Sequence, residues 1–167
     1  MNLIDDPDYL AALTEAETQQ KKPRAKPPTR FAARALLVPL GEVLLESGDD
    51  VAAAAGALQR VRALFDGNRD GWTAAVRDDL TLAVTEHVRS CDPRYLKLAN
   101  YDFPYTVAAR HRLEARLRAA AELEFPVDEV LLEQIERADR ELAPHLERDG
   151  RSAGTTGSTP PSSRPRG

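Results

Sequence analysis

Residues 66–71 place oxygen-bearing side chains at alternating positions, Asp66, Asn68 and Asp70, and end in Gly71. This is the first half of an EF-hand loop, where positions 1, 3 and 5 supply oxygens to Ca²⁺ and glycine at position 6 permits a sharp turn. The residue at position 12, which should be a bidentate glutamate, is Arg77. Because Asp, Asn and Gly also favour tight turns, the segment predicts a plain turn between two helices.

His87 and Cys91 are a second candidate for chemistry, because residues four apart share one face of a helix. Such a pair can form a nucleophile with its base, or half of a metal site. Both residues continue an apolar stripe that contains Trp72, Val76 and Leu80. We therefore interpret them as a buried thiol beside a core histidine, and assign no catalytic residue, metal ligand or cofactor.

An aromatic and basic segment is the best candidate for a binding surface. Four of the nine aromatic residues lie within eleven positions, among several basic residues. Aromatic and arginine side chains dominate protein interfaces, and they also stack unpaired bases and hold phosphates. A third interpretation is that the tyrosines only pack the segment against the rest of the protein. The predicted partner-binding residues are Tyr95, Lys97, Tyr101, Phe103, Tyr105, Arg110 and Arg112.

Composition restricts the class of protein. A chain of 167 residues can form one domain, and its net charge of −4 argues against a nucleic-acid binder with a wholly basic surface, although it does not exclude a local patch. A single cysteine, Cys91, cannot form an internal disulfide framework and fits a reducing compartment. Acidic residues near the N-terminus do not resemble an export signal, and the most apolar run, residues 31–45, is too short and too polar to span a membrane. A cytoplasmic protein is expected, and its many Ala and Arg residues are common in bacterial proteins.

The helices that would position these residues are predicted from apolar residues that recur about every 3.6 residues and from capping residues. Apolar stripes predict helices over about residues 29–47, 51–65 and 72–91, and Asp92-Pro93 and Asp102-Pro104 each predict a helix start. A short connection before Pro126, and arginines facing acids across it, predict a C-terminal antiparallel helical hairpin. The fold class is all-α, a compact bundle of five or six helices with flexible termini.

Charge and proline mark three regions. Residues 1–28 combine an acidic helix with a basic, proline-rich linker, residues 29–149 form the helical bundle domain, and residues 150–167 are a disordered tail without large apolar residues. Neither flank is expected to supply a substantial apolar face to the core.

Three functions remain open. The sequence favours a small helical interaction or assembly subunit that binds a protein partner or itself. The first alternative is a subunit holding single-stranded nucleic acid in a larger complex. This alternative is disfavoured because many acidic side chains lie close enough on the helices to neutralise the basic side chains. No measurable binding of single-stranded RNA or DNA is therefore expected at physiological salt. The second is a small metal-binding protein or enzyme built on His87 or on the Asp66 turn.

Overall fold

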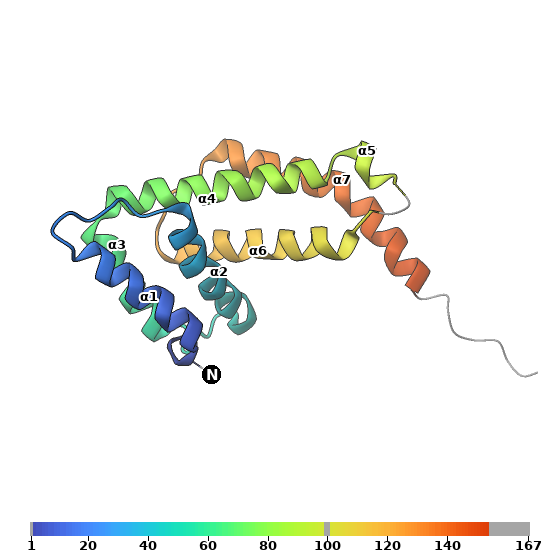
Figure 1. Cartoon of the computed structure of the whole chain (residues 1–167). Coiled ribbons are helices and arrows are strands. Elements are labelled where there is room, and N and C mark those ends of the chain that lie inside the picture. The colour runs from blue at the N-terminus through green and yellow to red at the C-terminus, as the bar shows by residue number, and fades with distance from the viewer. Residues whose placement is uncertain (1, 99–100, 154–167) are drawn as a thin grey trace, which may run out of the picture.

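The computed structural model describes residues 2–98 and 101–153, which form seven α-helices and no β-strand (Figure 1). The helices are α1 (Pro7–Gln20), α2 (Arg30–Ser47), α3 (Ala55–Gly67), α4 (Arg69–Ser90), α5 (Pro93–Leu96), α6 (Phe103–Glu122) and α7 (Glu129–Ala153), and a 3₁₀ helix (Leu3–Asp5) precedes α1. The all-α class is confirmed. Within the described ranges, no helix is long and apolar enough to cross a membrane. The tail expected at residues 150–167 overlaps the end of α7, and its part from residue 154 onward lies outside the described residues.

Local signals set where several helices begin. The Asp92 carboxylate accepts the backbone N–H of Arg94 and precedes Pro93 at the start of α5. The carboxylate of Asp102 caps α6 in the same way, by accepting the N–H of Tyr105 at 3.1 Å. These side-chain acceptors satisfy N–H groups that have no partner within the helix, which is why both starts could be predicted.

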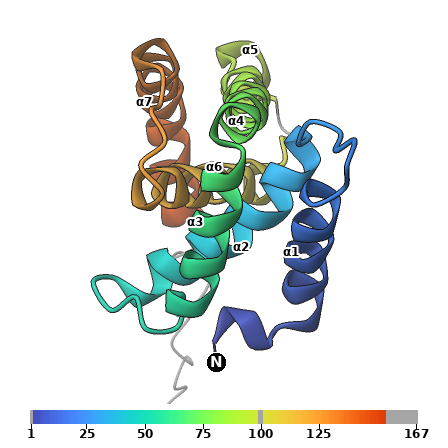
Figure 2. The same ribbon diagram turned by 90° about the vertical axis from the view of Figure 1, so that its left-hand side faces the viewer.

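The longest helices lie beside one another and α2 crosses them. In Figure 1, α1, α2 and α3 gather at one end and α5 lies at the other; Figure 2 shows α4 and α7 side by side above α6. Helix α2 packs most extensively on α6 and also contacts α4. Its approach to α6 depends on Gly41, where an added Cβ would lie 1.8 Å from the carbonyl oxygen of Ala115.

The C-terminal hairpin is only partly as expected. Helices α6 and α7 are consecutive and joined by residues 123–128, but α7 packs mainly on α4 and also touches α5. A direct pairing of α6 with α7 is therefore not confirmed. One of the anticipated charge pairs joins them, Arg110 with Asp139, whereas Arg116 reaches Asp79 on α4 instead.

Helix α1 belongs to the core, contrary to the expectation that residues 1–28 add no substantial apolar face. Leu3, Tyr9 and Leu13 are all buried in the main hydrophobic cluster. The Tyr9 hydroxyl donates to the carbonyl oxygen of Leu36 at 3.3 Å, and the Gln20 amide joins α3 and α4 through two further hydrogen bonds. The sequence pattern of α1 is weakly amphipathic because it has few large apolar residues, yet those few are deeply inserted.

Substitution of Leu13 tests this packing. Leu13→Ala is expected to lower the free energy of unfolding by about 2–5 kcal/mol, because it leaves a cavity in a packed core. Leu10→Ala is the matched control, since Leu10 lies on the outer face of the same helix with 37% of its surface exposed. Urea denaturation followed by circular dichroism measures both. Equal effects of the two substitutions would show that α1 is a detachable flank.

Candidate functional site

The predicted surface separates into an inner and an outer part. Tyr101 and Phe103 form the inner part, packing edge to face with ring centroids 4.6 Å apart. The Tyr101 hydroxyl donates to the carbonyl oxygen of Ser90 and lies 2.7 Å from the Thr106 hydroxyl. Both rings cover a small hydrophobic cluster made by Cys91, Leu96, Ala138 and Leu142. For these two residues, the interpretation that the aromatic rings pack the segment against the protein is the better one.

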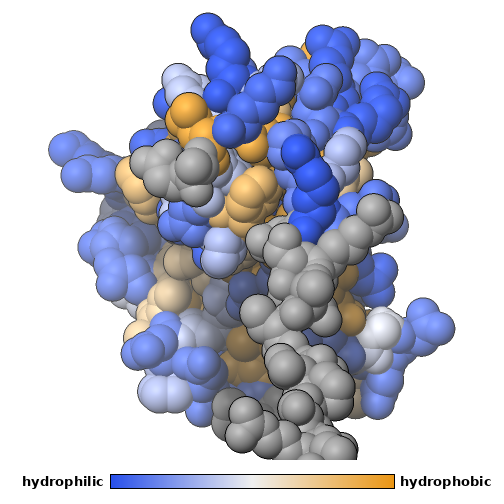
Figure 3. Space-filling model, turned by 90° about the vertical axis from the view of Figure 1, so that its right-hand side faces the viewer, coloured by the Kyte–Doolittle hydropathy of each residue, from blue (hydrophilic) through white to orange (hydrophobic). Residues whose placement is uncertain are grey.

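The outer part is exposed on both sides of the same loop. Tyr95 is 47% exposed and Tyr105 is 62% exposed, and Lys97 is also exposed. Leu98, which the sequence analysis did not select, is 52% exposed. We call these four residues the contact surface. They belong to the end of the molecule formed by α5 and the start of α6, where Figure 3 shows apolar side chains between polar ones.

The two predicted arginines are less exposed than the two tyrosines of the contact surface, and Arg110 is paired within the protein. The Arg110 guanidinium binds both carboxylate oxygens of Asp139, through Nε at 2.9 Å and Nη2 at 2.9 Å. Arg112 is half-buried, and its carbonyl oxygen accepts a hydrogen bond from Arg116 at 3.2 Å. The Arg110 charge is therefore compensated within the protein, and neither arginine belongs to the contact surface.

Beneath the contact surface lies a polar cluster made by His87, Cys91, Arg110 and Asp139. The His87 Nε2 atom is 2.8 Å from the Asp139 carboxylate, although only 1% of the histidine is exposed. The Cys91 sulfur is 3.7 Å from His87 Nδ1. Through these contacts the cluster connects α4, α6 and α7 at one point.

The electrostatics of the polar cluster favour a structural role. Burial alone would raise the pKa of the Asp139 carboxyl, but hydrogen bonds from Arg110 and His87 outweigh it and hold that pKa below its usual value. Burial raises the pKa of the Cys91 thiol, so the nucleophilic thiolate is disfavoured. Because the thiol is also only 2% exposed, a substrate has no direct access to it. The arrangement supports the prediction of a buried thiol beside a core histidine.

Asn68 alone separates α3 from α4, so the other residues of the turn expected at 66–71 belong to the two helices. Asn68 caps α4, because its side-chain oxygen accepts the backbone N–H of Gly71 at 3.2 Å. The Asp66 carboxylate faces solvent and lies 3.8 Å from Arg69. The Asn68 side chain is thus used by the helix cap, and the described residues contain no cluster of three or more His, Cys, Asp or Glu that could hold a metal ion.

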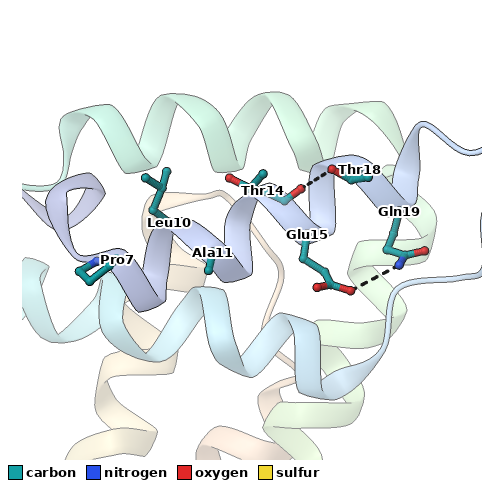
Figure 4. Close-up of a pocket in the computed structure, with 7 residues that line it drawn as sticks. All are labelled: Pro7, Leu10, Ala11, Thr14, Glu15, Thr18 and Gln19. Carbon is teal, nitrogen blue, oxygen red and sulfur yellow. Dashed lines mark hydrogen bonds between the residues drawn. The ribbon is translucent and has the colours of Figure 1, made fainter.

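A shallow hollow of about 540 Å³ lies over the outer face of α1 (Figure 4). It is lined by Pro7, Leu10, Ala11, Thr14, Glu15, Thr18 and Gln19. Two hydrogen bonds run along the helix there: the Thr18 hydroxyl donates to the Thr14 carbonyl at 2.8 Å, and the Gln19 amide donates to the Glu15 carboxylate at 3.4 Å. Because every lining residue belongs to one helix, no opposing wall encloses a ligand.

Comparisons with family models, curated proteins and solved structures found no match to this chain.

Proposed function

We propose that this protein is a small helical interaction or assembly subunit that binds a protein partner through the contact surface Tyr95, Lys97, Leu98 and Tyr105. The observation that supports it is the exposure of three large side chains around one loop, with 47%, 52% and 62% of Tyr95, Leu98 and Tyr105 accessible. Tyrosines bury a large area on binding with little loss of side-chain entropy. Tyr95 lies on α5 and Tyr105 on α6, and the inner pair, Tyr101 and Phe103, packs on the hydrophobic cluster that includes Leu96 of α5.

The charges around this surface favour a protein over nucleic acid. A phosphate backbone requires cations that are not already compensated. Arg94 is bound to Asp92 at 2.7 Å and Arg110 to Asp139 at 2.9 Å, which leaves Lys97 as the exposed cation of the contact surface. We further propose a cytoplasmic location, because the single cysteine needs no oxidising compartment.

The test is a double substitution that spares the inner pair. Tyr95→Ala with Tyr105→Ala is expected to leave the fold intact and to weaken binding of the partner by about 2 kcal/mol or more. The partner is obtained by co-purification from the native host, identified, produced in pure form and titrated by calorimetry. Sedimentation equilibrium tests self-association in parallel.

The matched control removes two exposed apolar side chains from α7, Val130→Ala with Leu132→Ala, which are 57% and 41% exposed. This control should bind as tightly as the unaltered protein. Equal weakening by both double variants would show that the contact surface is not specific. A chain that stays monomeric and binds no purified partner would disprove the proposal.

A further inference from the structure

A charged surface lies at the opposite end of the molecule from the contact surface (Figure 1). Residues 21–34 carry six bases and no acid. We call these six basic side chains the basic segment: Lys21, Lys22, Arg24, Lys26, Arg30 and Arg34. The first four lie in the connection between α1 and α2, and the last two on the first turns of α2. All are exposed except Arg30, which is half-buried.

No carboxylate of the described residues forms an ion pair with the basic segment, although Lys21, after the hydrogen bond from Arg60, helps to lower the pKa of Glu17. The neighbouring Arg60 is bound to Glu17 at 2.7 Å. The polar contact made by Lys22 is to the neutral amide of Gln19, at 2.8 Å. Such a concentration of like charge repels itself and attracts a polyanion. The overall charge of −4 conceals this local excess.

An exposed aromatic ring lies within the basic segment. Phe31 is 64% exposed, although α2 buries other apolar residues such as Leu36 and Leu37 on its inner face. The guanidinium carbon of Arg30 lies 4.6 Å from the centroid of the Phe31 ring, which leaves much of the ring accessible. An aromatic ring among cations is the combination that stacks an unpaired base while the cations hold the neighbouring phosphates.

Both ends of the connection are fixed to the fold, which limits the entropy lost on binding. Before it, Gln20 donates to the carbonyl oxygen of Leu64 at 2.8 Å. After it, Thr29 caps α2 by accepting the backbone N–H of Ala32 at 3.2 Å. Pro27 and Pro28 further restrict the backbone between these points.

We propose that residues 21–34 bind single-stranded nucleic acid, with the cations of the basic segment on the phosphates and an unpaired base stacked on Phe31. A lipid surface is the weaker fit, because membrane insertion needs a wide apolar face and Phe31 is the large exposed apolar side chain of this segment. A protein partner would need several clustered anchors. The contact is electrostatic and therefore strongly salt-dependent, which agrees with the expectation of no measurable binding at physiological salt.

The test is fluorescence anisotropy with labelled single-stranded RNA and DNA of mixed sequence at low salt. If all six cations of the basic segment take part, affinity should fall about 100-fold for a threefold rise in salt. Lys22→Gln with Arg24→Gln and Lys26→Gln should weaken binding at least about 30-fold and reduce the slope of log affinity against log salt by about 2. Phe31→Ala should weaken binding about 5-fold or more with an unchanged slope, and Phe31→Trp should restore it.

Two controls separate this site from bulk charge and from the contact surface. Arg77→Gln with Arg89→Gln and Arg137→Gln removes three exposed charges elsewhere and should leave affinity nearly unchanged. The Tyr95→Ala and Tyr105→Ala variant should also bind normally, so failure of one proposal does not imply failure of the other. The proposal is overturned if no oligonucleotide binds at low salt, if the control triple variant loses as much affinity, or if only vesicles containing anionic lipid bind.

Discussion

Gly41→Ala is expected to lower the free energy of unfolding by about 3 kcal/mol or more. The added Cβ would lie 1.8 Å from the carbonyl oxygen of Ala115 and 2.3 Å from its carbonyl carbon. These are backbone atoms of α6, so no side-chain rotation relieves the overlap and the two helices must separate. The higher helix propensity of alanine, worth about 1 kcal/mol, opposes this loss without cancelling it. Urea denaturation measures the change.

Gly56→Ala is the matched control for that substitution. Its Cβ would lie 2.8 Å from the terminal methyl of Ile4, the flexible end of a side chain that can move. The change should therefore alter stability by less than about 1 kcal/mol. A Gly41→Ala protein as stable as the control would show that α2 and α6 do not cross as closely as described.

Removing one member of the buried Arg116–Asp79 pair is the second substitution with a large expected effect. Arg116 Nε lies 2.7 Å from Asp79 Oδ2, and the two side chains are 7% and 5% exposed. Arg116→Met would leave the Asp79 carboxylate buried without its cation, and should lower the free energy of unfolding by about 3–5 kcal/mol. Replacing both residues, Arg116→Met with Asp79→Leu, should recover most of that loss.

A double-mutant cycle on unfolding free energies measures the coupling between these two residues. The control is the exposed pair Arg94–Asp92, in which the arginine side chain is 84% exposed. Arg94→Ala should leave the urea midpoint nearly unchanged, because an exposed ion pair is screened by solvent. Additive effects of Arg116→Met and Asp79→Leu would mean that the two charges are each solvated and do not depend on one another.

Features encoded by neighbouring residues could be predicted. The caps at Asp92 and Asp102 each require only an acceptor followed by a proline in the first turn, and both are present. The inward stripe of α4 also follows from spacing, since Trp72, Leu80 and His87 are buried. Val88, next to His87 in the chain, is 40% exposed.

Features that depend on distant contacts could not be predicted. The pattern of α1 is weak, and the partner of the Tyr9 hydroxyl, Leu36, lies on another helix. Which tyrosine turns inward was also hidden, because Tyr101 is fixed by Ser90 and Thr106, whereas Tyr95 and Tyr105 have the same chemistry and stay outside. The sequence therefore located the segment of the candidate site, residues 95–105, but it did not predict which of its side chains turn inward.

The pattern of charges predicted that arginines of α6 pair with acidic residues, but it did not predict which acidic residue each arginine contacts. The sequence placed arginines of α6 opposite acids of α7, and the Arg110–Asp139 pair follows that pattern. Arg116 faces α4 instead because it lies on the buried side of α6, and Arg118 lies 3.9 Å from Glu122 on its own helix. The partner of a residue depends on which face of the helix it occupies, and tertiary packing decides which face of α6 is buried.

The crossing of α2 with α6 also has a consequence for how the chain is made. Helix α2 emerges from a ribosome before α6, the helix that covers it most extensively, and three other helices are translated between them. Until then, the apolar face containing Leu37, Leu40 and Leu44 lacks its main cover. The nascent chain is therefore open to aggregation and to capture by chaperones until α6 has emerged.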